Sequence, residues 1–270
     1  MNTKILLCTT VVLATGCNSL LNIQDKVEGY TDRFVVQGIY LGLEEPTDPD
    51  LADALATGGG NFDQGSTFTV FLADAASIDE VENAPITGAV GTLLSPANGS
   101  VDLTDDGNGK YTATADDGLV YTGGETVTLQ VTSGGVQHKA NVEAPPAPSL
   151  DLPETHTKGT ALAINLEGQG FDSALVVVLD MSSGDVTWSN EPGDIGELYD
   201  FTHGETEGAS VAIPANALSD ATLYAVGVAG MVNADPDTFE DVNTALSTMM
   251  AGKLTFGVLC TLEPVDLCDL

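Results

Sequence analysis

The feature that most limits the possible fold is a succession of short segments rich in Val, Ile, Leu, Thr, Tyr and Phe, separated by clusters of Gly, Asn and Asp. STFTVFLAD at 66–74 and ETVTLQV at 125–131 alternate apolar and polar residues, as half-buried strands do. Segments of this kind recur at a spacing of about 8–12 residues, which is typical of β-sandwiches. The sequence therefore predicts an all-β chain.

In the first half of the chain, strands are predicted at 34–43, 66–74, 86–94, 99–104, 110–115, 125–131 and 136–142. TDDGNG at 104–109 is predicted to form a hairpin turn, because Gly and Asn readily adopt positive φ. In the second half, strands are predicted at 160–167, 174–181, 185–188, 209–213, 222–230 and 253–260. The single predicted helix spans 236–250, with Asp235 as its N-cap and Pro236 at its first position.

The Pro-rich segment APPAP at 144–148 predicts a stiff, extended linker. It divides the chain into two expected β-sandwich domains, 33–143 and 149–270, of which the second contains the short helix. Residues 17–32 are expected to be a tether that precedes the first domain. A hydrophobic content of 43% is sufficient for both domains to have a core.

The charge balance is strongly acidic, with 40 Asp and Glu residues against 7 Lys and Arg residues and a formal net charge of −33. Nucleic-acid phosphates and anionic lipid headgroups would both be repelled by such a surface, so neither is an expected partner. The simplest interpretation is solubility, or function in a salty medium that screens the repulsion. A cation-binding role is the alternative.

The first seventeen residues, MNTKILLCTTVVLATGC, read as an export signal. Lys4 provides a positive start, and the mostly apolar stretch 5–14 is too short to cross a hydrocarbon core of about 30 Å as a helix. Ala14-Thr15-Gly16-Cys17 resembles the bacterial lipobox, although Ala14 stands where Leu is usual. The resemblance implies cleavage after Gly16, lipidation of Cys17 and attachment to a lipid bilayer. An ordinary secretory signal with a chance cysteine is the alternative.

The residue after the cysteine is Asn18. By analogy with bacterial lipoprotein sorting, the absence of Asp at this position favours the outer membrane or cell surface as the destination.

Two cysteines, Cys260 and Cys268, remain in the tail CTLEPVDLC. In an oxidising compartment they are expected to form a structural disulfide; a metal site or a redox-active pair is less consistent with their spacing and surroundings.

Two segments resemble known classes of domain. PITGAVGTLLSPANGSVDLTDDGNGKYTA at 85–113, followed by GLVYTGGETVTLQV, resembles the transthyretin-like, carboxypeptidase-regulatory β-sandwiches of bacterial surface proteins. VAIPANALSDATLYAVGVAG at 211–230 resembles the late strands of bacterial immunoglobulin-like domains. Both resemblances concern the fold and imply no catalytic residues.

No constellation typical of catalysis stands out, because no Ser lies in a GxSxG elbow and His138, His156 and His203 are scattered. Calcium binding is the more specific hypothesis, since hard cations bind carboxylates in Gly- and Asn-rich loops. The weak candidate ligands are Asp102, Asp105, Asp106, Asp235 and Asp237. DLTDDGNG fails as an EF-hand loop, because Ala113 occupies the place of the bidentate Glu. Trp188, the single Trp, is expected to pack on a sheet more than to bind a ligand.

Taken together, these features predict a membrane-anchored envelope lipoprotein with a structural, adhesive or assembly role, no enzymatic activity and no cofactor. Its expected partners are the bilayer, through acylated Cys17, and other envelope proteins. The alternative is a calcium- or ligand-binding surface lipoprotein.

Overall fold

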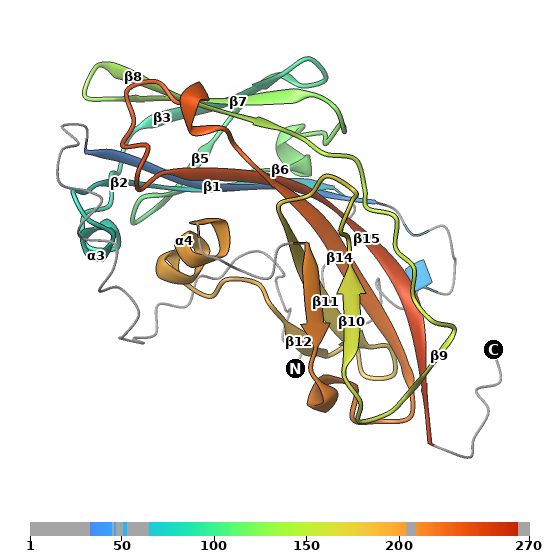
Figure 1. Cartoon of the computed structure of the whole chain (residues 1–270). Coiled ribbons are helices and arrows are strands. Elements are labelled where there is room, and N and C mark those ends of the chain that lie inside the picture. Colours follow the sequence, from blue (N-terminus) through green and yellow to red (C-terminus); the bar gives the residue numbers. More distant parts are fainter. Residues whose placement is uncertain (1–32, 45, 47–50, 53–64, 204–208, 264–270) are drawn as a thin grey trace, which may run out of the picture.

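The computed structural model describes residues 33–44, 46, 51–52, 65–203 and 209–263, and this part of the chain consists mainly of β-strands (Figure 1). The all-β class is therefore confirmed. The strands are β1 Phe34–Leu43, β2 Ser66–Asp74, β3 Val90–Ser95, β4 Gly99–Asp102, β5 Thr104–Gly107, β6 Lys110–Thr114, β7 Thr126–Ser133, β8 Val136–Glu143, β9 Thr155–Thr157, β10 Leu162–Asn165, β11 Ser173–Asp180, β12 Val186–Ser189, β13 Ser210–Ile213, β14 Leu223–Asn233 and β15 Thr248–Leu262. The helices are α3 Ile78–Val81 and α4 Ile195–His203, with 3₁₀ turns at Ala115–Asp117, Ala215–Leu218 and Pro236–Thr238.

A nine-stranded sheet forms the body of the molecule. Its strands lie in the order β12-β11-β14-β15-β1-β2-β6-β5, and β9 pairs with the far end of β15. Neighbours along this order are antiparallel except β1 and β15, which run parallel, as β9 and β15 also do. Strands from both sides of the linker at 144–148 thus share this sheet.

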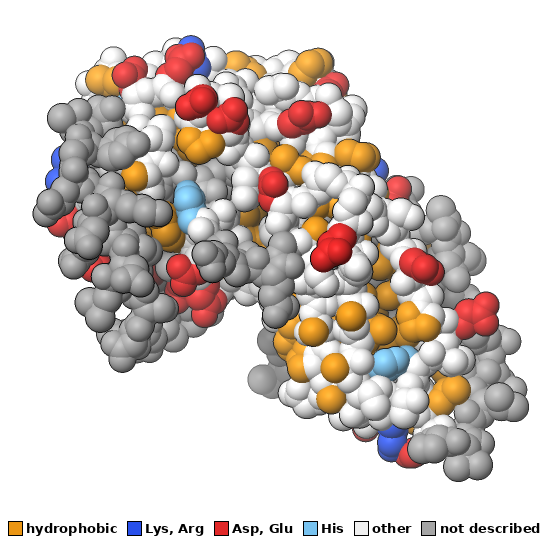
Figure 2. All heavy atoms as spheres, in the orientation of Figure 1, with side chains coloured by type: hydrophobic (Ala, Val, Ile, Leu, Met, Phe, Trp, Pro, Cys, Tyr) orange, Lys and Arg blue, Asp and Glu red, His pale blue; other side chains and the backbone are white. Residues whose placement is uncertain are grey.

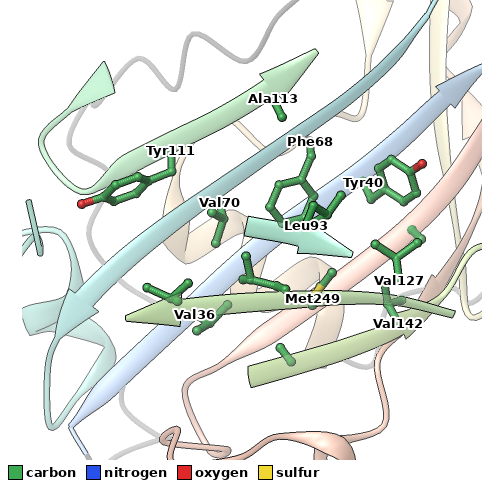
Figure 3. Packing of buried hydrophobic residues seen from close by; sticks show 14 of the residues in the cluster. Val36, Tyr40, Phe68, Val70, Leu93, Tyr111, Ala113, Val127, Val142 and Met249 are labelled. Atoms are coloured by element: carbon green, nitrogen blue, oxygen red, sulfur yellow. The ribbon is translucent and has the colours of Figure 1, made fainter. Parts of the chain in front are cut away.

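A four-stranded sheet, in the order β4-β3-β7-β8, lies over one part of the large sheet. The main hydrophobic core fills the space between these two layers. Figure 3 shows Val36, Tyr40 and Phe68 of the large sheet opposite Leu93 and Val127 of the smaller one. The chain passes from one sheet to the other between β4 and β5, at Leu103, whose backbone N–H donates to the Gly91 carbonyl oxygen at 2.9 Å.

The strand sequences reflect which faces are covered. In β7 (TVTLQVTS) exposed and buried residues alternate, as expected for a strand with one face toward solvent. In β11 (SALVVVLD) seven consecutive residues are buried, and the first half of β1 is buried as well, because both faces of the large sheet are covered there. A second core, formed with the two-stranded sheet β10-β13, covers one face of β11 and β14, while α3 and α4 pack on the opposite face of the large sheet.

The helix predicted at 236–250 is wrong. Only the 3₁₀ turn Pro236–Thr238 forms there, and β15 begins at Thr248. The predicted cap is present, since the Asp235 carboxylate accepts a hydrogen bond from the Asp237 backbone N–H at 3.0 Å. The helix stops after one turn because Met249, Met250 and Ala251 are needed in the sheet, where each is fully buried between β14 and β1.

Candidate functional site

The predicted lipidation residue Cys17 and the predicted export signal at 1–16 lie outside the described residues. Cys260 lies near the end of β15, where it is 1% exposed and disulfide-bonded. Its expected partner, Cys268, is also outside the described residues, so the pairing of these two cysteines stays a prediction.

Among the candidate carboxylates, Asp105 is held by two backbone N–H groups. One oxygen accepts from the Gly88 backbone N–H at 2.8 Å, and the other accepts from the Gly107 backbone N–H at 2.8 Å. These two hydrogen bonds stabilise the charged form and hold the pKa of Asp105 below its usual value. The carboxylate therefore fastens the loop before β3 to the β5–β6 hairpin.

The other candidate carboxylates also contact protein donors near them in the chain. Asp106 accepts from the Thr112 hydroxyl at 2.9 Å, and Asp102 accepts from the Thr92 hydroxyl at 3.4 Å. Asp235 caps the 3₁₀ turn that contains Asp237, far along the sequence from the β4–β6 residues. Within the described ranges, no group of three or more His, Cys, Asp or Glu side chains is arranged to hold a metal ion.

Acidic side chains are spread over the surface in Figure 2, and basic ones are few. Four basic residues form ion pairs with acidic neighbours: Arg33 with Asp74 at 2.5 Å, Lys139 with Glu240 at 2.7 Å, Lys253 with Glu44 at 3.9 Å, and Lys158 with Glu263. These pairs offset only a small part of the acidic excess. The described surface is consequently dominated by negative charge that has no basic partner.

The three histidines each place a ring nitrogen near a carbonyl oxygen. His138 Nδ1 lies 2.5 Å from the Asp241 carbonyl oxygen, His156 Nε2 lies 3.1 Å from that of Thr160, and His203 Nδ1 lies 3.3 Å from that of Tyr199. A carbonyl oxygen only accepts, so these nitrogens carry hydrogen and donate. The hydroxyl of Thr160, 2.9 Å from His156 Nε2, itself donates to the Thr157 carbonyl oxygen. His156 is thus not placed to withdraw a proton from that hydroxyl.

Trp188 lies on β12 and is partly buried against the second core. Leu150, Leu152 and Phe171 are also partly buried against this cluster. This contact gives Trp188 a sheet-packing role.

The residues that connect the two sheets form a junction that the sequence did not reveal. Glu240 makes an isolated antiparallel bridge with Lys139 of β8, and the His138 ring stacks on Phe34 of β1 with ring centroids 3.5 Å apart. The Asn243 backbone N–H donates to the Phe34 carbonyl oxygen at 2.8 Å. The segment that precedes β15 therefore fastens the four-stranded sheet and β1 to each other.

At the other end of β1, the buried Tyr40 and the partly buried Tyr121 hold the 119–121 loop and the linker. The Tyr40 hydroxyl donates to the Val120 carbonyl oxygen at 2.9 Å, and the Tyr121 hydroxyl donates to that of Pro145 at 2.8 Å. Burial raises the pKa of Tyr40 to about 12 and raises the pKa of Tyr121 as well. Both phenol groups therefore stay protonated and act as hydrogen-bond donors that hold the structure together.

The helix α4 was missed, although the sequence carries its signal. Asp194 and Glu197 have the spacing of a capping box, with Asp194 accepting from the Glu197 backbone N–H at 2.7 Å and Glu197 accepting from that of Gly193 at 2.6 Å. The helix packs Leu198 and Phe201 against the large sheet. The motif DIGE at 194–197 is thus a signal for the start of this helix, but the same spacing in DLPE at 151–154 and DTFE at 237–240 starts no α-helix, so the motif alone does not predict it.

Comparison with models of known protein families and with curated proteins finds no match to this chain. Among the described helices, none combines the length and apolar character that a membrane crossing would require.

Proposed function

We propose that this chain is an exported lipoprotein, anchored to the outer membrane or cell surface through acylated Cys17, whose β-sandwich domains have a structural, adhesive or assembly role without catalysis. The observation that carries the proposal is the N-terminal pattern: Lys4, an apolar stretch at 5–14, and Ala14-Thr15-Gly16-Cys17. Each methylene of an acyl chain that enters the bilayer contributes about 0.8 kcal/mol, and two or more chains give stable anchoring.

The charge of the protein supports an anchor made of lipid. Loss of 1–16 removes Lys4 and leaves six basic residues against 40 acidic ones, a formal charge of −34. Such a surface has no electrostatic attraction to anionic headgroups. Attachment then depends on the acyl chains at Cys17.

The number of residues between the proposed anchor and the first described strand is consistent with this arrangement. Sixteen residues, 18–33, separate Cys17 from the start of β1 at Phe34. A chain of that length spans at most about 50–60 Å when fully extended. The tether is thus long enough for the acidic body to stay clear of the headgroups.

The arrangement of polar side chains supports a role that does not involve catalysis. Two of the five candidate carboxylates, Asp105 and Asp235, accept hydrogen bonds from backbone N–H groups in turns, and the described histidines donate to main-chain carbonyls. Groups engaged in this way stabilise loops.

The anchor is tested by changing Cys17→Ser and comparing the product with wild type by intact mass and by partition into detergent. We expect the mutant to lose the mass of the acyl chains and to remain uncleaved or to become soluble. Cys8→Ser is the matched control, because Cys8 lies in the segment that is removed, and it should behave as wild type. If the Cys17→Ser protein is processed and partitions into detergent as wild type does, the lipoprotein proposal is wrong.

The assembly role is tested separately, by cross-linking the native lipidated protein in intact cells and identifying the attached proteins. We expect specific envelope proteins to be recovered with wild type and to be reduced with Cys17→Ser, which removes the protein from its membrane. An unchanged set of partners with the unanchored variant would contradict a role at the membrane.

A further inference from the structure

The first and last strands of the described chain lie side by side in the middle of the large sheet (Figure 1). β1 and β15 are parallel, in register from Gln37 opposite Thr248 to Leu43 opposite Leu254. Backbone hydrogen bonds extend the pairing at both ends: Asn243 N–H donates to the Phe34 carbonyl oxygen at 2.8 Å, and Glu44 N–H donates to the Leu254 carbonyl oxygen at 2.8 Å. This contact joins residues more than 200 positions apart in the sequence.

The parallel orientation determines how this pair responds to tension. A pull from the N-terminal side enters β1 at Phe34, and a pull from the C-terminal side enters β15 near its end, between the disulfide-bonded Cys260 and Leu262. Since the strands run in the same direction, these two pulls oppose each other along the strand axis and tend to slide β1 past β15. Sliding loads all the hydrogen bonds of the pair together, whereas peeling an antiparallel pair from one end loads them one after another.

Both strands are also held firmly on their other edges. β1 pairs with β2 from Phe34 opposite Asp74 to Gly42 opposite Ser66, and β15 pairs with β14 from Met250 opposite Asn233 to Cys260 opposite Leu223. Neither strand can therefore leave the sheet without breaking a second long ladder.

The pair is buried, which restricts access of water to its hydrogen bonds. Val35, Val36 and Tyr40 of β1 and Met249, Met250 and Ala251 of β15 are each no more than 1% exposed. In this environment a stretched backbone hydrogen bond is not readily replaced by one to water. A side-chain contact adds to the pair at its start, where the Val36 N–H donates to the buried Ser247 hydroxyl at 3.0 Å.

We propose that the parallel β1–β15 pair is a mechanical clamp, which allows this protein to bear tension between its N-terminal attachment and a partner held at its C-terminal end. The inference deepens the proposed function, because the anchor at Cys17 is the source of the load on β1. It assigns the β-sheet body a load-bearing role between the membrane and a second envelope or extracellular component.

The clamp is tested by single-molecule force spectroscopy on the full chain carrying Cys8→Ser and Cys17→Ser, with one pulling handle fixed at the N-terminus. The second handle is placed after Leu270 in one sample and on Ala76→Cys in the other. Ala76 is exposed and follows β2, so the second geometry separates the adjacent ends of β1 and β2 and peels β1 from its start. Glu82→Cys, also exposed, provides a second position for the handle if Ala76→Cys does not fold.

We expect the end-to-end geometry to require an unfolding force about two- to threefold higher than the peeling geometry at the same loading rate. The reason is that the rate of forced unfolding depends on the height of the barrier along the direction of pulling. Equal forces in the two geometries, or a lower force end to end, would overturn the clamp. The measurement uses a chain without lipid, so its outcome is independent of the Cys17 test. An anchor that fails the lipidation test leaves the force comparison unchanged.

Discussion

The ring of Tyr121 lies directly over Gly42 of β1, so close that a Cβ placed on Gly42 would lie 2.6 Å from the Cβ of Tyr121 and 2.7 Å from its Cδ1. Gly42→Ala should therefore displace Tyr121 and its hydrogen bond to Pro145, and should lower the free energy of unfolding by about 1–3 kcal/mol. Chemical denaturation measures this change.

Gly38→Ala is the matched control on the same strand. A Cβ at Gly38 meets its nearest neighbours, in Phe68 and Val70, at 3.5 Å, an ordinary packing distance. This variant should be neutral or stabilising by up to about 1 kcal/mol, because alanine restricts the unfolded chain. Equal losses at the two positions would contradict the close approach of Tyr121.

Asn98 and Asn108 both precede glycine but differ in their contacts. The Asn98 carboxamide accepts from the Val120 N–H at 2.6 Å and donates to the Val120 carbonyl oxygen at 2.9 Å, whereas Asn108 occupies the β5–β6 turn with φ of 52°. Asn98→Asp removes the donor that faces Val120 and should cost about 1–3 kcal/mol of stability. Asn108→Asp should change stability by less than about 0.5 kcal/mol. A similar loss in both variants, measured by thermal unfolding, would show that the Asn98 contacts contribute little.

The lowered pKa of Asp105 predicts that the stability of the fold depends on pH. The N–H groups of Gly88 and Gly107 lower the pKa of Asp105 in the folded protein below the value of about 3.9 that it has when unfolded. Its contribution is therefore complete above that value and is lost as the pH falls through the lower folded pKa. Asp105→Asn should lower the melting temperature at pH 7, and this difference from wild type should shrink in strong acid. Asp106→Asn is the control, because its amide oxygen can still accept the hydrogen bond from the Thr112 hydroxyl. A deficit in Asp105→Asn that is constant with pH would contradict this explanation.

The excess of acidic residues predicts that salt stabilises the fold. Raising ionic strength from 0.01 M to 0.15 M shortens the Debye length from about 30 Å to about 8 Å and weakens the repulsion between carboxylates. The melting temperature should rise in sodium chloride, and calcium at equal ionic strength should add only a modest further shift. Melting that is independent of salt would contradict the repulsion. A large shift specific to calcium would favour the calcium-binding alternative, because coordination requires direct carboxylate ligands.

Because the large sheet contains strands from both halves of the chain, it predicts how the two halves behave when they are expressed as separate fragments. Fragments 33–143 and 149–270 are expected to fold as β-rich units, and each then exposes one strand of the β1–β15 pair. When mixed, the fragments should form a complex that elutes as one species in size-exclusion chromatography. Folded fragments that remain separate would show that the pairing depends on an intact linker.

Local pattern was sufficient to predict most strands, and the bounds of β1 and β2 agree with the prediction residue for residue. Each of these strands has its own local signal: β2 alternates buried and less buried residues, and β1 is rich in Phe, Val, Ile, Tyr and Leu. The start of β15 could not be predicted in this way. Met249, Met250 and Ala251 favour helices in isolation, and they become a strand only because β1 and β14 lie on either side of them.

The junction around Phe34 illustrates the same limit for the candidate site. His138, Phe34 and Asn243 are brought together by three segments separated by about a hundred residues each, and no local motif marks such a contact. The sequence marks Asp105 only by its carboxylate, whereas its structural role depends on the loop at Gly88, which only the tertiary structure brings close to it.

The bridge between Lys139 and Glu240 protects a sheet edge, which matters if many copies share one membrane, as the proposed anchor at Cys17 implies. It occupies part of the outer edge of β8, where the backbone N–H and carbonyl groups of the strand would otherwise be open to a strand from a neighbouring molecule. In the part of the chain that the structure describes, the remaining edge strands of the two larger sheets are β4, β5, β9 and β12, none longer than four residues, and β5 carries Asp105 and Asp106. Short, charged or covered edges oppose edge-to-edge aggregation, so neighbouring copies can be packed densely on one surface and still remain separate molecules.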